Sequence, residues 1–154
     1  MKQRIHFLLL VGLSLLISPI SHAATYRVDD SATIVTDAQV KMRWRSSGAN
    51  RVNGNIVDGT TFVTIRLNTA PWLNKTGQIY MVLAPQPIGQ VVVDWSTQGK
   101  LLPGSLVSGN RTLVYAGTIQ QNMIEDTFYI QVHSDGTRLN DMHKLEFYFE
   151  IDIN

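Results

Sequence analysis

Side chains suited to metal or acid–base chemistry are few in this sequence. Beyond residue 23 there are two histidines, His133 and His143, and they flank Asp135 and Asp141. The spacing of ten residues between these histidines matches no usual zinc-ligand motif, so a surface hairpin is the better interpretation. The chain has no cysteine, which excludes thiolate metal sites and cysteine nucleophiles. We therefore expect neither a metal nor a cofactor.

The motifs of common enzyme classes are missing as well. The sequence lacks a Gly-x-Ser-x-Gly elbow, a His-Glu-x-x-His pair and a phosphate-binding glycine loop. It has only three glutamates, and two of them, Glu146 and Glu150, belong to the polar face of a predicted strand. No carboxylate pair for glycoside hydrolysis can be assigned from this pattern. The expectation is that the protein is not an enzyme.

Three tryptophans are candidates for stacking on a sugar ring. Trp44 continues the apolar alternation of its segment, so we expect it in the core. Trp95 lies at a predicted strand end and fits either position. Trp72, within Ala70-Pro71-Trp72-Leu73-Asn74, falls in a predicted loop. It is therefore the candidate for an exposed ligand contact.

The first 23 residues are expected to be an export signal rather than part of the fold. Lys2 and Arg4 form a basic start, an apolar run follows from Phe7 to Ile17, and small residues precede a cut after Ala23. This order is typical of a secretory signal peptide, and the apolar run is shorter than the ~20 residues that span a bilayer. The net charge of the whole chain is +1, which gives no electrostatic footprint for nucleic acid.

The remaining sequence predicts an all-β sandwich or barrel. Short segments rich in β-branched and aromatic residues recur along it, separated by Gly, Asn, Asp, Ser and Pro. Val57-Asp58-Gly59 and Ser134-Asp135-Gly136 are turn signals between such segments. The predicted strands are Gln39–Arg45, Thr60–Leu67, Gln78–Leu83, Gln90–Trp95, Arg111–Ala116, Thr127–His133 and Lys144–Ile153.

The C-terminal segment has the clearest strand pattern in the sequence. Large apolar residues occupy every odd position, namely Leu145, Phe147, Phe149, Ile151 and Ile153, and charged residues take positions 146, 150 and 152. This alternation predicts one face toward a core and one toward water. The sequence given ends on this strand, so no later segment is at hand to pair with its far edge by a simple hairpin.

The N-terminal segment after residue 23 also alternates, with mostly apolar residues at even positions from Tyr26 to Trp44. A single strand of that length is improbable, so we predict two strands broken near Thr36-Asp37, with Ala38–Trp44 in the core. The first strand is spare, and Tyr26, Val28, Ala32 and Ile34 could enter a groove on a neighbouring molecule. Such β-augmentation is head-to-tail and builds a fibre. The alternative is that this strand pairs within its own domain, because periodicity does not reveal strand order.

At Ala24–Gly48 the sequence resembles a subunit of chaperone–usher pili. Ser31-Ala32-Thr33-Ile34-Val35 followed by Asp37-Ala38-Gln39-Val40-Lys41-Met42-Arg43-Trp44 is similar to the donor strand and first strand of the cysteine-free, capsule-like and thin-fibre branch. The final alternating strand fits the last strand of that family. Residues 49–126 carry no matching motif.

The resemblance implies a fold, a set of partners and a location. The fold is an all-β, incomplete immunoglobulin-like sandwich completed by donor-strand complementation. The implied organisation is a signal peptide at 1–23, a donor-strand extension at 24–36 and a pilin domain at 37–154. The implied donor side chains are Ala32 and Ile34, with Val28 and Tyr26, and the acceptor groove is lined by Phe147, Phe149 and Ile151.

The implied partners are a periplasmic chaperone along Leu145–Ile153, an outer-membrane usher, other pilus subunits and a host receptor. The expected function is an exported fimbrial subunit that polymerises by donor-strand exchange at the cell surface and contributes to adhesion. The alternative is a self-complete secreted β-sandwich that recognises a glycan or a host protein.

Overall fold

The computed structural model describes residues 24–36, 40–45, 55–87, 90–138 and 144–154. Within these ranges the regular structure is strand, apart from two short 3-10 turns, η2 (Ala70–Trp72) and η3 (Gly136–Arg138). Every pairing between the named strands is antiparallel. The expectation of an all-β fold is confirmed. The predicted signal peptide at 1–23 lies outside the described residues, and so does His143.

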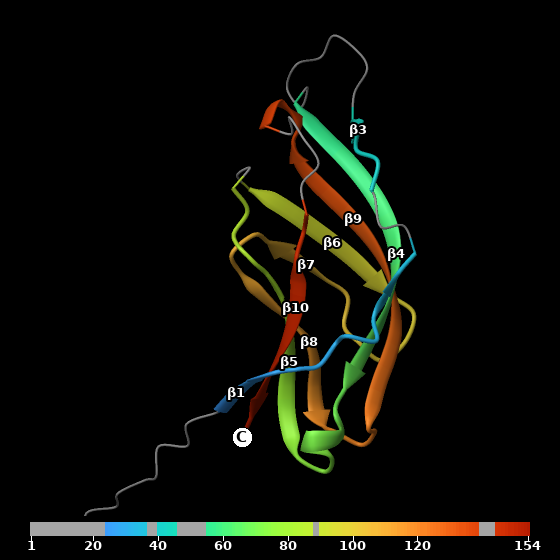
Figure 1. Cartoon of the computed structure of the whole chain (residues 1–154), viewed down its shortest axis with the longest axis vertical. Coiled ribbons are helices and arrows are strands. Elements are labelled where there is room, and N and C mark those ends of the chain that lie inside the picture. Colours follow the sequence, from blue (N-terminus) through green and yellow to red (C-terminus); the bar gives the residue numbers. More distant parts are fainter. Residues whose placement is uncertain (1–23, 37–39, 46–54, 88–89, 139–143) are drawn as a thin grey trace, which may run out of the picture.

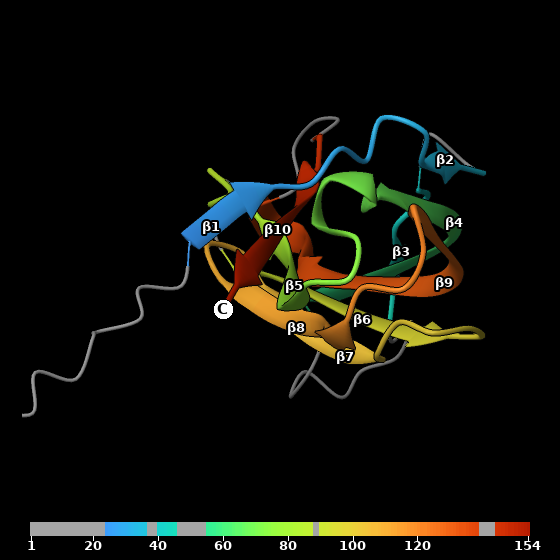
Figure 2. The ribbon, with the colours of Figure 1, turned by 90° about the horizontal axis from the view of Figure 1, so that it is seen from below.

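The strands form two sheets that lie face to face (Figures 1 and 2). Sheet A has the order β1–β10–β5–β8, and sheet B has the order β2–β4–β9–β6–β7 with β3 also paired to β4. The strands of sheet A are β1 (Ala24–Arg27), β10 (Phe147–Ile153), β5 (Thr76–Leu83) and β8 (Arg111–Thr118). Those of sheet B are β2 (Ile34–Val35), β3 (Arg43–Trp44), β4 (Ile56–Asn68), β6 (Val91–Thr97), β7 (Gly104–Val107) and β9 (Met123–Asp135).

The core lies between the two sheets and follows the alternation of the sequence. On β4 and β9 buried and more exposed residues alternate along all 13 positions of each strand. Phe128 of β9 stacks on Trp95 of β6 with 6.0 Å between ring centroids, and Phe149 and Ile151 of β10 face them from sheet A as members of the same core cluster. This arrangement is a β-sandwich whose inner faces are closed by apolar side chains.

The two sheets differ in strand length, and this difference exposes Trp44. β4 and β9 have 13 residues each, whereas β10 has seven and β5 has eight. Trp44 pairs with Val57 at the end of β4 and is 54% exposed, so the expectation that it lies in the core is wrong. Its ring lies against Gly136, where a Cβ atom would come within 2.6 Å of the indole.

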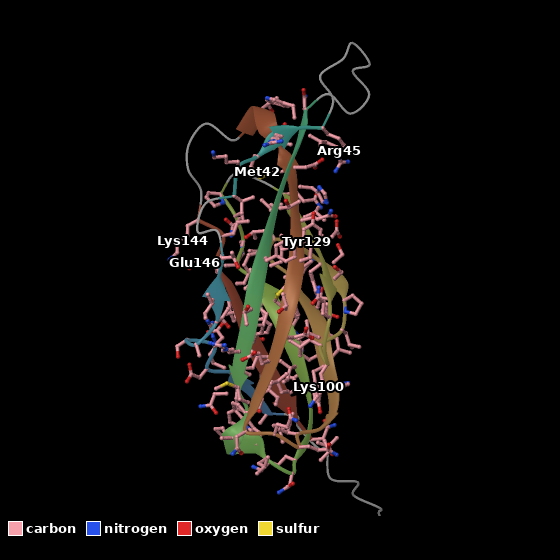
Figure 3. The ribbon with its side chains drawn as sticks, turned by 90° about the vertical axis from the view of Figure 1, so that its right-hand side faces the viewer. Met42, Arg45, Lys100, Tyr129, Lys144 and Glu146 are labelled. Carbon is pink, nitrogen blue, oxygen red and sulfur yellow. The ribbon has the colours of Figure 1, made fainter. Side chains whose placement is uncertain are left out.

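The predicted turn at Val57-Asp58-Gly59 is wrong, because these residues belong to β4. Gly59 supplies space rather than a turn: a Cβ atom there would collide with the side chains of Val40 and Met42. Figure 3 shows Met42 and Arg45 near the same end of the long strands, whereas Lys100 lies toward the other end. The segment around Met42 therefore packs on the inner face of β4 at Gly59. A larger residue at position 59 would prevent this packing.

Most other strand predictions agree with the structure to within a few residues, but one predicted strand is much shorter and one strand was missed. The predicted strand Gln39–Arg45 is reduced to the two paired residues of β3, and residues 37–39 lie outside the described part of the chain. The four residues of β7 were not predicted. Val91-Val92-Val93 lies in β6 with Val91 and Val93 buried in the core and Val92 half-buried on the outer face.

The loop between β6 and β7 is held by a buried carboxylate. Asp126 of β9 accepts hydrogen bonds from the backbone N–H of Leu101 at 2.8 Å, of Gln98 at 3.3 Å and of Thr127 at 2.7 Å. Gly99 approaches so closely that a Cβ atom there would lie 2.9 Å from the carboxylate. A buried carboxylate needs such partners, and here the loop backbone supplies two of them and the N–H of Thr127 in β9 supplies the third.

Candidate functional site

The N-terminal strand is paired with the C-terminal strand at the edge of sheet A. The register places Ala24, Thr25, Tyr26 and Arg27 of β1 opposite Ile153, Asp152, Ile151 and Glu150 of β10. One more backbone hydrogen bond joins the N–H of Val28 to the carbonyl of Phe149 at 2.9 Å. All four residues of β1 are exposed, and β10 is its sole strand partner in the described structure. The described chain therefore begins with an edge strand.

Two side chains hold the inner side of this segment. Val28 is 0% exposed and belongs to the core cluster together with Phe149 and Ile151. Tyr26 packs on Trp72 of η2 with 6.0 Å between ring centroids. Burial of the Val28 side chain stabilises the attachment of this segment by roughly 1.5–3 kcal/mol. Val28 is therefore the anchor of a segment that is otherwise exposed.

Trp72 does not have the predicted exposure. Its indole is only 9% exposed and is part of the core cluster, so the expectation of an exposed ligand contact is wrong. The 3-10 turn η2 directs the ring under β1, where it meets Tyr26. Trp72 lies in a connection between strands as predicted, but only the tertiary packing turns this connection across the end of the sandwich.

Polar contacts on the outer face of sheet A also join β1 to the other strands. The Thr25 hydroxyl donates to Asp152 at 2.5 Å, and Arg111 of β8 lies 3.1 Å from the same carboxylate. The Arg27 guanidinium lies 3.9 Å from the centroid of the Tyr148 ring. The Thr25 hydroxyl first, and Arg111 second, hold the pKa of Asp152 below its ordinary value, since both favour the charged carboxylate.

These outer-face residues were not among the predicted site residues. The signal was present in the sequence, because Arg27 and Glu150 are opposite charges on two segments that alternate with the same period. The structure places them directly opposite each other in the register. Opposite charges at facing positions favour one register over its neighbours.

The chain leaves sheet A at Asp29 and crosses to sheet B. The carbonyl of Asp29 accepts the N–H of Asn68 at 2.9 Å, and its carboxylate accepts the N–H of Ser31 at 3.1 Å. The hydrogen bonds of Ser31 hold the pKa of Asp29 below its ordinary value. β2 then pairs with β4, with Ile34 opposite Thr64 and Val35 opposite Val63. The extension at 24–36 thus contributes one short strand to each sheet.

The predicted donor side chains therefore do not lie together. Tyr26 and Val28 lie against sheet A, whereas Ala32 and Ile34 are exposed on the crossing segment and on β2. The predicted groove residues of the last strand share one face: Phe149 and Ile151 are buried, and Leu145, Phe147 and Ile153 are partly buried against the core. β1 occupies the part of the β10 edge from Phe149 to Ile153.

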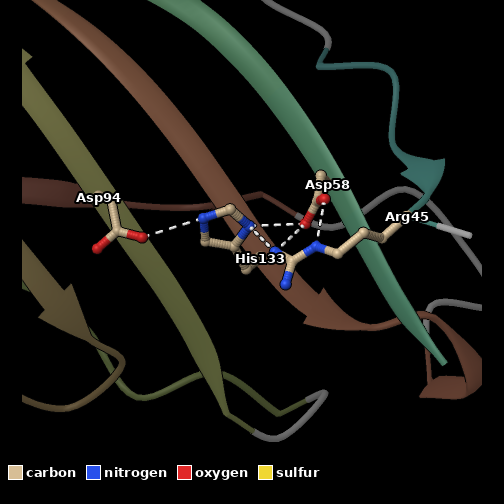
Figure 4. A network of polar contacts seen from close by, with 4 residues as sticks. All are labelled: Arg45, Asp58, Asp94 and His133. Atoms are coloured by element: carbon tan, nitrogen blue, oxygen red, sulfur yellow. Dashed lines mark hydrogen bonds and ion pairs between the residues drawn. The ribbon is translucent and has the colours of Figure 1, made fainter. Parts of the chain in front are cut away.

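A second polar cluster lies on the outer face of sheet B (Figure 4). His133 is within 2.6 Å of Asp58 through Nδ1 and within 3.0 Å of Asp94 through Nε2, and Arg45 pairs with Asp58 at 2.7 Å. Arg45 first, and His133 second, hold the pKa of Asp58 below its ordinary value. These four side chains tie β6, β9, β4 and the segment after β3 together across the sheet.

An aromatic pair lies farther along the same outer face. Phe62 of β4 is 48% exposed and faces Tyr129 of β9 with 5.0 Å between ring centroids. Figure 3 shows Tyr129 in the middle part of the long strands. Within the described ranges no group of three or more metal-ligating side chains is found, and no helix is long and apolar enough to span a bilayer.

Comparisons with protein-family models, with characterised proteins and with solved structures find no match to this chain.

Proposed function

We propose that this protein is an exported fimbrial subunit that polymerises by exchanging its N-terminal strand with the next subunit. The observation that carries the proposal is β1 itself. It is an edge strand near the start of the chain, its residues are exposed, and it is anchored by Val28 alone in the core. A strand at a sheet edge with a single side chain in the core can be replaced by the same strand of another molecule.

Exchange between two molecules replaces each contact of β1 by the same contact with another copy. A second chain can make all of these contacts. They are the four residue pairs with β10, the burial of Val28 in the core and the contact of Tyr26 with Trp72. Domain swapping of this kind costs little, because each interaction that breaks within one molecule forms again between two. Since the donor strand and the acceptor edge are different surfaces, exchange in one direction makes a head-to-tail contact, and such contacts extend into a fibre when they do not close into a ring or a reciprocal dimer.

The finer features of the proposal come from the family resemblance. The sandwich is immunoglobulin-like and is completed along β10 by a donor strand. A periplasmic chaperone covers the edge of Leu145–Ile153 until an outer-membrane usher replaces it by the next subunit. The fibre stands on the cell surface and contributes to adhesion through a host receptor.

Engineered cysteines test strand exchange directly, because the chain has no cysteine of its own. Thr25 and Asp152 face each other, and directly opposed residues of antiparallel strands have Cα separations that a disulfide can bridge. Thr25→Cys and Asp152→Cys are placed in separate chains of different size, which are mixed and oxidised. We expect a covalent heterodimer in several-fold excess over the control pair, Thr25→Cys with Ser96→Cys on the exposed face of β6.

The double variant in one chain is the second arm of this test. T25C/D152C closes β1 onto its own β10, so the oxidised protein is expected to remain monomeric and its reduced form to assemble. A heterodimer yield equal to the control, together with complete intrachain closure of the double variant, would show that β1 stays in its own molecule.

A second candidate function is a self-complete binding module for a glycan. It is favoured by the exposed Phe62 and the half-buried Tyr129, whose neighbours on the outer face are Thr60, Thr64 and Gln131. Aromatic rings bind the apolar face of a sugar, and hydroxyl and amide groups bind its rim. Phe62→Ala should abolish glycan binding, whereas Leu102→Ala, which removes another exposed apolar side chain, should not. Unchanged binding in the Phe62 variant would eliminate this site.

A further inference from the structure

We propose that the exchanged element is limited to Ala24–Val28 and that the chain crosses between molecules within Asp29–Ala32. Thr33 and β2 (Ile34–Val35) stay on β4 of their own subunit. The inference rests on the strand exchange proposed above and specifies which residues take part in it. In this proposal Asp30 is the residue that ends the donor strand.

The limit follows from which side chains of the N-terminal segment point toward the core. Tyr26 pairs with Ile151, and Val28 follows it into the core on the same side of the strand. If the segment continued along β10 in the same register, Asp30 would face Phe147 and Ala32 would face Leu145. Phe147 and Leu145 are partly buried against the core, so the Asp30 carboxylate would lie beside these apolar side chains.

Partial burial of an unpaired carboxylate beside apolar side chains is unfavourable. The structure avoids this cost by turning the chain away from β10 directly after Val28. The turn is built by the Asp29 carboxylate with the N–H of Ser31 and by the N–H of Thr33 with the carbonyl of Asp30 at 2.9 Å. A donor strand in a second molecule meets the same Phe147 and Leu145, so it must end at the same residue.

The residues after the turn have separate attachments to their own sheet B. The Thr33 hydroxyl accepts the N–H of Arg66 at 3.0 Å, and the N–H of Thr36 donates to the carbonyl of Phe62 at 3.1 Å. Together with the pairing of β2, these bonds hold Thr33–Thr36 on β4 whether or not β1 has left. The crossing between molecules therefore spans the five steps from Val28 to Thr33, which reach about 17 Å when fully extended. It also requires that the hydrogen bond between Asn68 and the Asp29 carbonyl breaks within the subunit.

This limit gives the exchanged interface a defined composition. Val28 of one subunit fills the core of the next, Tyr26 meets the neighbour's Trp72, and Ala32 and Ile34 remain outside the groove. The short crossing also requires that the β10 edge of one subunit lies close to the β4 edge of the other. Neighbouring subunits in the fibre are accordingly in close contact.

The test uses two cysteine pairs that report different parts of the same strand. Thr25→Cys with Asp152→Cys in separate chains reports exchange of β1. Ser31→Cys with Glu146→Cys reports a donor strand that continues past Asp30, because Ser31 would face Glu146 in the continued register. We expect the first pair to give a heterodimer and the second to fall below it by at least about tenfold.

The variant Asp30→Val tests whether the Asp30 carboxylate is what keeps the Ser31→Cys and Glu146→Cys pair apart. Removing the carboxylate lets the segment follow β10, so S31C with E146C should now form a heterodimer at a yield within about threefold of the first pair. Efficient S31C–E146C linkage with Asp30 in place would overturn the limit while leaving strand exchange intact. Absence of the T25C–D152C heterodimer would refute the exchange itself, and the limit with it.

Discussion

Replacement of Val28 by alanine measures how strongly the N-terminal strand is held. Val28 is 0% exposed in the core, whereas Val35, in the same segment, is 49% exposed on β2. Val28→Ala removes two buried methyl groups, each worth about 0.8 kcal/mol of transfer free energy. The space left behind raises the expected loss to about 2 kcal/mol. Val35→Ala is the matched control, and its expected cost is below about 0.5 kcal/mol.

The loss should appear in two measurements. Urea unfolding followed by circular dichroism should give a free energy of unfolding lower by about 2 kcal/mol for Val28→Ala. Because β1 is an edge strand that pairs with β10 alone among the described strands, it should also open locally before the sandwich unfolds. Hydrogen exchange of the residue 28 amide, which is bonded to the carbonyl of Phe149, should accelerate by about 30-fold.

The comparison with Val35 decides the outcome. Equal destabilisation by V28A and V35A would mean that Val28 does not anchor the strand. Acceleration of exchange throughout β4 and β9 as well would mean that β1 does not open independently. In that case exchange of the strand would require unfolding of the whole domain.

Three further predictions concern the contacts around this site and the ends of the sandwich. Asp126→Asn should lower the free energy of unfolding by about 1–3 kcal/mol, measured in urea, because the loop N–H groups lose a charged acceptor. The pKa of Asp152 is lowered from its ordinary value of 3.8, chiefly by the Thr25 hydroxyl, so this carboxylate stabilises β1 above that pH and loses its effect as the pH falls through its folded pKa. Hydrogen exchange in β1 should therefore accelerate with added acid relative to β9, and Asp152→Asn should remove that pH dependence. Gly136→Ala should cost about 1–3 kcal/mol, because the added methyl meets the Trp44 ring and the Val57 side chain, and only the part due to the ring should disappear in a Trp44→Ala background.

The C-terminal strand was predictable in both position and orientation. The odd residues Phe149 and Ile151 are buried as expected, and Glu150 and Asp152 lie on the outer face. Alternation with a period of two is a property of the local sequence, and it needs no knowledge of the partner strand. The same property located most of β4, β5, β6, β8 and β9.

The N-terminal segment was predictable only in its strand character. Alternation from Tyr26 to Ile34 suggested one donor strand, but the structure divides the segment between the two sheets. The segment divides at this point for a local reason. In one continuous strand Asp30 would lie on the same face as Tyr26 and Val28, and its carboxylate would then lie beside apolar side chains. This cause was visible in the sequence only once the neighbouring strand and its register were known.

The sequence by itself determined the class of the fold and the inward face of the last strand. It also located Trp72 in a connection between strands. The tertiary structure decided that Trp72 is buried under Tyr26, that Trp44 is exposed and that β1 pairs with β10. Burial and pairing depend on residues more than one hundred positions apart in the chain, such as Thr25 and Asp152. Local periodicity specifies which side chains share a face, and only the packed sheets specify what covers that face.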